Sequence, residues 1–137
     1  MKNLILFTVI VIGVSHLSAQ STTADKNYIL RINNKAFNSG DTISKAELAS
    51  VHRGVIQVAD KNNKTYQPSS YECVISVLGT KEAWVTTAKT NPPVAGELNS
   101  LDEAIAKAAT GDIVFFDRFQ FINSSTNLPK QFSLVVR

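Results

Sequence analysis

The sequence predicts a mainly β fold: a single β-sandwich-like domain in which two short helices form a minority α+β component. Three observations support this class. Several short segments are rich in β-branched and aromatic residues, and clusters of Asn, Asp, Gly and Pro separate them. Two S-x-x-E frames mark helix starts. Beyond residue 19, 118 of the 137 residues remain, which is enough to close one hydrophobic core.

The chain begins with a predicted secretory signal peptide, residues 1–19. Lys2 gives a positive start, residues 4–14 (LILFTVIVIGV) are apolar, and small residues precede the predicted cleavage between Ala19 and Gln20. A membrane anchor is the alternative, but the apolar run is shorter than the roughly 18 residues that span a bilayer. We therefore expect an exported protein that works in the periplasm or outside the cell.

After the predicted cleavage, residues 20–26 (QSTTADK) are small and polar, as in a flexible leader, and residues 27–137 form the predicted folded domain. Its first strand is expected at 28–32, where apolar residues alternate on one face. Asn33-Asn34 closes this strand with residues typical of turns.

The first predicted helix starts at a capping box. Ser44 can accept a hydrogen bond from the backbone three residues on, and Glu47 can reach back to the Ser44 N–H. We expect a short helix at 45–51, with Gly54 at the point where the chain leaves it. A second strand is expected at 55–58.

The middle of the sequence predicts reversals of chain direction. A polar cluster at 60–64 is expected to form a hairpin-like turn. Residues 71–78 and 82–87 are both rich in strand-forming residues, so they form the best predicted hairpin, around a turn at 79–81. Two consecutive prolines place residues 89–99 in a loop.

The second predicted helix starts at another capping box, with Ser100 as the cap and Glu103 as its partner. Gly111 is expected to end this helix in left-handed geometry. Four residues share its expected buried face: Leu101, Ala104, Ile105 and Ala108. Two last strands are expected at 112–122 and 131–136.

Charge and cysteine content exclude several classes of function. After residue 19, 13 basic and 11 acidic side chains remain, scattered singly, which is not the basic stripe of a nucleic-acid binder. Cys73 is the only cysteine, so no intramolecular disulfide can form, and its apolar alternation predicts a buried, inert thiol. A lipoprotein anchor would need a cysteine where Gln20 stands. We expect no membrane span after processing.

The residues that could carry catalysis are few. His52 is the only histidine after residue 19 and lies beside Arg53 at a predicted helix end, which favours a capping role over that of a general base. Glu97, Asp102 and Glu103 are close in sequence, but two of them belong to a helix start. One histidine and one cysteine cannot form a zinc site, and no glycine-rich phosphate loop is present. We expect no enzyme, metal or cofactor.

Trp84 is the main candidate for partner binding, because tryptophan is enriched at binding hot spots. A strand tryptophan is more often part of the core, so the prediction depends on its exposure beside Lys81 and Tyr71. The second candidate is the loop stiffened by Pro92 and Pro93, which an enzyme inhibitor could present.

Two stretches resemble a known family. Residues 40–48 (GDTISKAEL) and 111–117 (GDIVFFD), with the Y-x-V-like residues 71–73 (YEC) between them, are similar in type and order to the C-terminal domain of the gliding motility protein GldM, also called PorM. The resemblance spans residues 29–136 and implies a compact β domain of the Gram-negative envelope, from the type IX secretion and gliding motor family.

The chain departs from that family in two respects. The transmembrane helix, helical bundle and preceding β domains of the family have no counterpart here, so we expect a standalone exported version. Residues 123–127 (NSSTN) replace the family's G-P-D-G turn. The resemblance implies a non-enzymatic protein-interaction module associated with the envelope or type IX secretion machinery. The alternative is a small secreted enzyme inhibitor, or an enzyme of unknown class.

Overall fold

The computed structural model describes residues 26–77, 83–124 and 128–137, and it has the predicted mainly β fold with two short helices. The smaller sheet has the strand order β2-β1-β4-β5, with β1 at Tyr28–Ile32, β2 at Lys35–Phe37, β4 at Ile56–Asp60 and β5 at Thr65–Tyr66. The larger sheet has the order β3-β9-β8-β6-β7, with β3 at Thr42–Ile43, β6 at Ser70–Ser76, β7 at Ala83–Ala88, β8 at Ile113–Gln120 and β9 at Gln131–Val136. The predicted signal peptide, its cleavage site and the turn at 79–81 lie outside the described residues.

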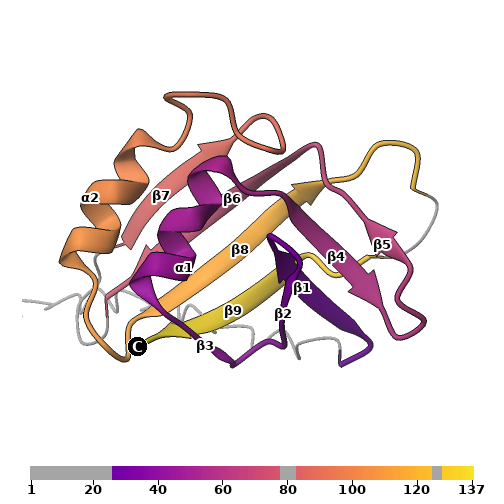
Figure 1. Ribbon diagram of the computed structural model, residues 1–137, viewed down its shortest axis with the longest axis horizontal. Coiled ribbons are helices and arrows are strands. Elements are labelled where there is room, and N and C mark those ends of the chain that lie inside the picture. The colour runs from indigo at the N-terminus through magenta and orange to yellow at the C-terminus, as the bar shows by residue number, and fades with distance from the viewer. Residues whose placement is uncertain (1–25, 78–82, 125–127) are drawn as a thin grey trace, which may run out of the picture.

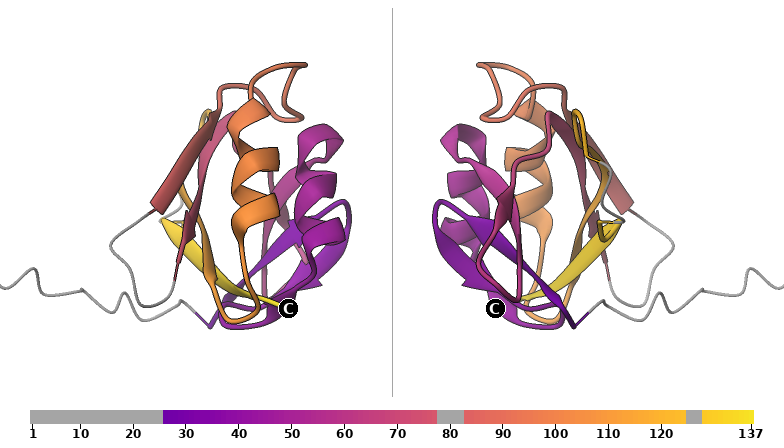
Figure 2. Two further views of the ribbon diagram at one scale, coloured as in Figure 1. Left: turned by 90° about the vertical axis from the view of Figure 1, so that its left-hand side faces the viewer. Right: turned by 90° about the vertical axis from the view of Figure 1, so that its right-hand side faces the viewer.

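The molecule has two layers. The five-stranded sheet forms one, and the other consists of the smaller sheet together with α1 (Lys45–Ala49) and α2 (Asn99–Lys107), as Figures 1 and 2 show. The core lies between the layers, and its largest fully buried side chains come from both: Leu30, Ile43, Leu48, Ile56, Tyr71, Ile75, Leu98, Leu101, Phe116 and Leu134. No described helix or strand covers the opposite face of the five-stranded sheet.

The first strand and its turn are as predicted. β1 and β2 form a tight antiparallel hairpin around Asn33 and Asn34, which both adopt left-handed backbone conformations, with φ of 51° and 69°. Asparagine tolerates this conformation, which a two-residue hairpin turn requires. Strand β4 is longer than the predicted 55–58, and it reverses into the short β5 at the predicted polar turn.

The first capping box is confirmed. Ser44 Oγ accepts a hydrogen bond from the Glu47 N–H, and Glu47 Oε2 accepts one from the Ser44 N–H at 2.8 Å. The α-helix ends at Ala49 and continues as a 3-10 turn, η1 (Ser50–Arg53). Gly54 ends it in an extended conformation. A Cβ atom there would lie 2.6 Å from Asn33 Nδ2, so a larger residue would displace the Asn33 side chain from its hydrogen bonds with Ser50 and Val55.

The prediction of a second capping box, at Ser100, is wrong. α2 begins at Asn99, one residue before the predicted cap, so Ser100 lies inside the first turn, and the N-cap position is Leu98, whose side chain makes no capping hydrogen bond. Gly111 is left-handed at φ 99° but follows the helix end by several residues, so it shapes a turn instead. The predicted buried face of α2 is confirmed, since Leu101, Ala104, Ile105 and Ala108 are all buried.

The predicted hairpin of β6 and β7 and the last two strands are confirmed, each within a few residues of its predicted bounds. β8 stops at Gln120, short of the predicted 122, and its pairing with β6 shifts register where Arg118 adopts a left-handed φ of 49°. Such a register shift is a β-bulge, which bends the strand. The sequence did not predict β2, β3 and β5, which are too short to show an alternating pattern.

Candidate functional site

The predicted partner residues do not form one surface. Tyr71 is 1% exposed and packs against Phe116, so its predicted place on a partner surface is wrong. Burial also raises the pKa of the Tyr71 hydroxyl. Pro93 is buried as well, whereas Pro92 is exposed, and Lys81 lies outside the described residues. Of the predicted set, Trp84 and Pro92 remain at the surface, on two neighbouring segments.

Trp84 lies on β7, which is the last strand of the five-stranded sheet. It stands opposite Ile75 of β6 and packs against the core, and it remains half-buried. Lys107, in the last turn of α2, places its Nζ 5.5 Å from the centroid of the indole ring. Cation–π contact therefore holds the ring beneath α2 at the edge of the sheet.

The two faces of β7 differ. Thr86 and Ala88 point inward and are buried, whereas Ala83, Val85 and Thr87 are exposed on the other face. Val85 has 56% of its surface exposed, which makes it one of the most exposed large hydrophobic residues among those described. Trp84 was predicted from the sequence as a partner residue and Val85 was not, because a local pattern does not show which strand lies at an edge.

The sheet edge formed by β7 differs from the other sheet edges in its length. The other three sheet edges are the short strands β2, β3 and β5, and β2 also carries Lys35. Short strands and lysines are the usual means by which proteins block pairing at a sheet edge. β7 is six residues long and its sequence, AWVTTA, contains no charge and no proline. Among the described strands, β7 is therefore the edge best able to pair with another chain.

The loop after β7 is held in place by side-chain hydrogen bonds. The Asn91 side chain accepts from the Ile56 N–H at 3.0 Å and donates to the carbonyl oxygens of Ile56 and Pro68 at 2.8 and 2.7 Å. These contacts tie the loop to the smaller sheet. The Asn91–Pro92 peptide bond is cis.

Glu97 stabilises the same loop through hydrogen bonds within it. Its carboxylate accepts hydrogen bonds from the Thr90 backbone and hydroxyl and from the Val94 N–H. Desolvation acts to raise the pKa of Glu97, but these hydrogen bonds outweigh it and the pKa lies below its usual value. Val94 extends from this braced loop with 57% of its surface exposed. The loop can therefore present Val94 in a fixed conformation.

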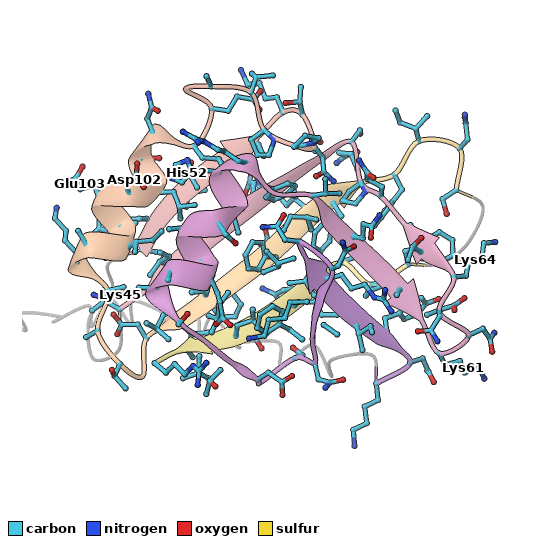
Figure 3. The ribbon with its side chains drawn as sticks, viewed as in Figure 1. Lys45, His52, Lys61, Lys64, Asp102 and Glu103 are labelled. Carbon is cyan, nitrogen blue, oxygen red and sulfur yellow. The ribbon has the colours of Figure 1, made fainter. Side chains whose placement is uncertain are left out.

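A cleft of about 390 Å³ lies between this loop, η1 and α2. His52 and Asp102 lie on its wall with Nε2 and Oδ1 2.9 Å apart, in a geometry that does not align for a hydrogen bond (Figure 3). The other lining residues are Arg53, Pro93, Val94, Ala95 and Gly96. None of the lining residues carries a hydroxyl or thiol, so the cleft offers a histidine and a carboxylate without a serine, threonine or cysteine nucleophile.

His52 is at a helix end, as predicted, since it lies in the last turn of η1 beside Arg53. Its side chain is 24% exposed, so it is not on open surface. Cys73 is fully buried, as predicted, and burial raises the pKa of its thiol to about 12. Within the described ranges, no cluster of three or more His, Cys, Asp or Glu residues could hold a metal ion.

Comparisons with known proteins found no matching family model, no matching curated protein and no matching solved structure. The resemblance to the GldM C-terminal domain therefore stays a prediction from the sequence. None of the helices that the structure describes has the length and apolar character to cross a membrane.

Proposed function

We propose that this chain is an exported, non-enzymatic protein-binding module, and that its partner belongs to the cell envelope or to type IX secretion machinery. The edge strand β7 carries this proposal, because it is long, uncharged and includes the exposed Val85. The signal-like residues 1–19 and the resemblance to the GldM C-terminal domain support the proposed location and class of partner.

Site-specific photo-crosslinking tests the proposal. A photoreactive residue at Val85 samples the β7 edge, and the same residue at Val94 is a matched control, because the two valines are 56% and 57% exposed. Cells that export the protein are irradiated, and crosslinked partners are identified and purified. We expect one envelope protein to crosslink at position 85 and to bind the purified chain.

The two valines also supply matched variants for the binding measurement. Val85→Lys places a charge on the β7 edge and should weaken binding of the purified partner by about tenfold or more. Val94→Lys should leave the affinity unchanged. Absence of a specific crosslink at either position, with no purified envelope protein binding the chain, would contradict the proposed function.

A second candidate function is enzyme inhibition by the braced loop, since Glu97 and Asn91 fix the loop that exposes Val94. Pre-organised loops bind with a smaller loss of conformational entropy. A panel of secreted proteases tests this candidate: inhibition that Val94→Asp abolishes and Val85→Lys leaves intact would favour it over the β7 edge.

A further inference from the structure

We propose that β7 binds its partner by strand addition, with an extended peptide segment forming a sixth strand of the larger sheet. This inference rests on the proposed function, and it names the binding mode and the chemical class of the partner. In strand addition, backbone hydrogen bonds supply affinity, and alternate side chains supply specificity.

The first support is the backbone of β7. A strand with a neighbour on one side only directs alternate N–H and C=O groups away from the sheet. β6 pairs with β7 along its whole length, from Tyr71 opposite Ala88 to Ser76 opposite Ala83. β7 is therefore held as one complete strand, and its other side is a continuous template for pairing.

The second support is the chemistry of the two faces. On the open face, an added strand would lie beside Val85 and Thr87, a hydrophobic and a β-branched residue. On the helix side it would lie beside Trp84, under Lys107 of α2. Cross-strand pairs of aromatic and β-branched residues stabilise a sheet. A segment that alternates such residues, without charge at its centre, fits both faces.

The arrangement of α2 favours a peptide over a second copy of this chain. α2 packs on the inner face of β7 more extensively than on β6, so it lies close to the edge (Figure 2). Antiparallel pairing of β7 with its own copy about a two-fold axis would bring both α2 helices to the same face. Helices that lie over two paired strands have axes as far apart as the strands, which is about 4.8 Å. Packed helices need about 8 to 10 Å between their axes. An extended segment without a helix avoids this conflict.

Peptide selection and backbone methylation test strand addition directly. A phage-displayed library of random peptides, about six residues long to match a typical strand, is selected on the purified chain. The strongest binder is then synthesised with N-methyl groups on its odd or on its even residues. Only one of these two sets faces β7, so we expect one set to weaken binding by about tenfold or more and the other to change it little.

Matched variants link the peptide to β7. Val85→Lys should weaken binding of the unmethylated peptide by about tenfold, whereas Val94→Lys should leave it unchanged. Equal effects of the two methylated sets, no selected peptide, an unaffected Val85→Lys variant, or self-association of the chain through β7 would each overturn strand addition. If strand addition fails while a purified partner still crosslinks at position 85 or 94, the chain remains a binding module with another mode. If both tests fail, the proposed function fails too.

Discussion

Replacing Asn91 by alanine should destabilise the whole domain, although this residue lies in a loop. The side chain makes three hydrogen bonds of 2.7 to 3.0 Å, one from the Ile56 N–H and two to the carbonyl oxygens of Ile56 and Pro68. A hydrogen bond contributes about 1 kcal/mol net to stability, so Asn91→Ala should lower the free energy of unfolding by about 3 kcal/mol. That is a large fraction of the roughly 5 to 15 kcal/mol by which domains are stable.

Urea unfolding measured by circular dichroism checks this value. At about 5 °C per kcal/mol for a domain of this size, the melting temperature should fall by about 15 °C. Asn62→Ala, in the exposed turn between β4 and β5, is the matched control and should change stability by less than about 0.5 kcal/mol. A loss below about 1 kcal/mol for Asn91→Ala, with an unchanged dependence on urea, would refute the reasoning.

Asn91→Asp separates the lost hydrogen bonds from the lost volume. The aspartate keeps the acceptor for the Ile56 N–H but turns a negative oxygen toward the two carbonyl oxygens that Asn91 Nδ2 now contacts. Those carbonyls favour the protonated acid, so the pKa of this aspartate should be higher in the folded than in the unfolded state. The variant should therefore gain stability relative to wild type as the pH falls, and lose it as the pH rises.

Three further predictions follow from single residues. Ser44→Ala should cost about 1 kcal/mol of stability because Ser44 is a true cap, whereas Ser100→Ala should cost less than about 0.5, and equal effects in urea unfolding would contradict the assigned start of α2. The hydrogen bond from Lys35, with those from Ser44, lowers the pKa of Glu47 to about 2, so its contribution to stability is complete above its unfolded pKa near 4.5 and is lost as the pH falls toward 2. Glu47→Gln should thus be less stable than wild type at neutral pH, and the two free energies of unfolding should converge near pH 2. A difference that stays constant with pH would count against a stabilising Lys35–Glu47 ion pair. Cys73 should react with thiol reagents only after unfolding, because burial raises its pKa to about 12, and rapid labelling of the folded chain would show that the thiol is accessible.

Local sequence patterns predicted the parts of the fold that local physics determines. Alternation over several residues predicted the longer strands, and the capping box at Ser44 predicted the start of α1, because each is encoded within a few consecutive positions. The same kind of signal failed at Ser100. There, α2 starts at Asn99, two residues before the predicted first helical residue Leu101, directly after the buried Leu98, and the frame of the motif no longer coincides with the cap. Tertiary packing overrides a short motif when the two disagree.

The candidate site could be predicted only in part, because it depends on the order of strands. The pattern of β7 was visible in the sequence, and Trp84 was noted, but the edge position follows from the arrangement β3-β9-β8-β6-β7, which brings together distant segments. The role of Asn91 was equally hidden. Its side chain bonds to two backbone groups of Ile56 in β4 and to the carbonyl oxygen of Pro68, just before β6. These residues lie 35 and 23 positions away in sequence.

The loop and the edge strand are parts of one rigid unit. β7 runs directly into the loop, where Glu97 fixes Thr90 and Asn91 is tied to β4 in the other sheet. The carboxyl end of β7 is therefore anchored to the second layer of the fold, and β6 pairs with its whole length. A binding strand that is already ordered pays little conformational entropy when a partner adds to it. The same hydrogen bonds that stabilise the domain thus keep its one long, uncharged edge among the described strands ready to pair.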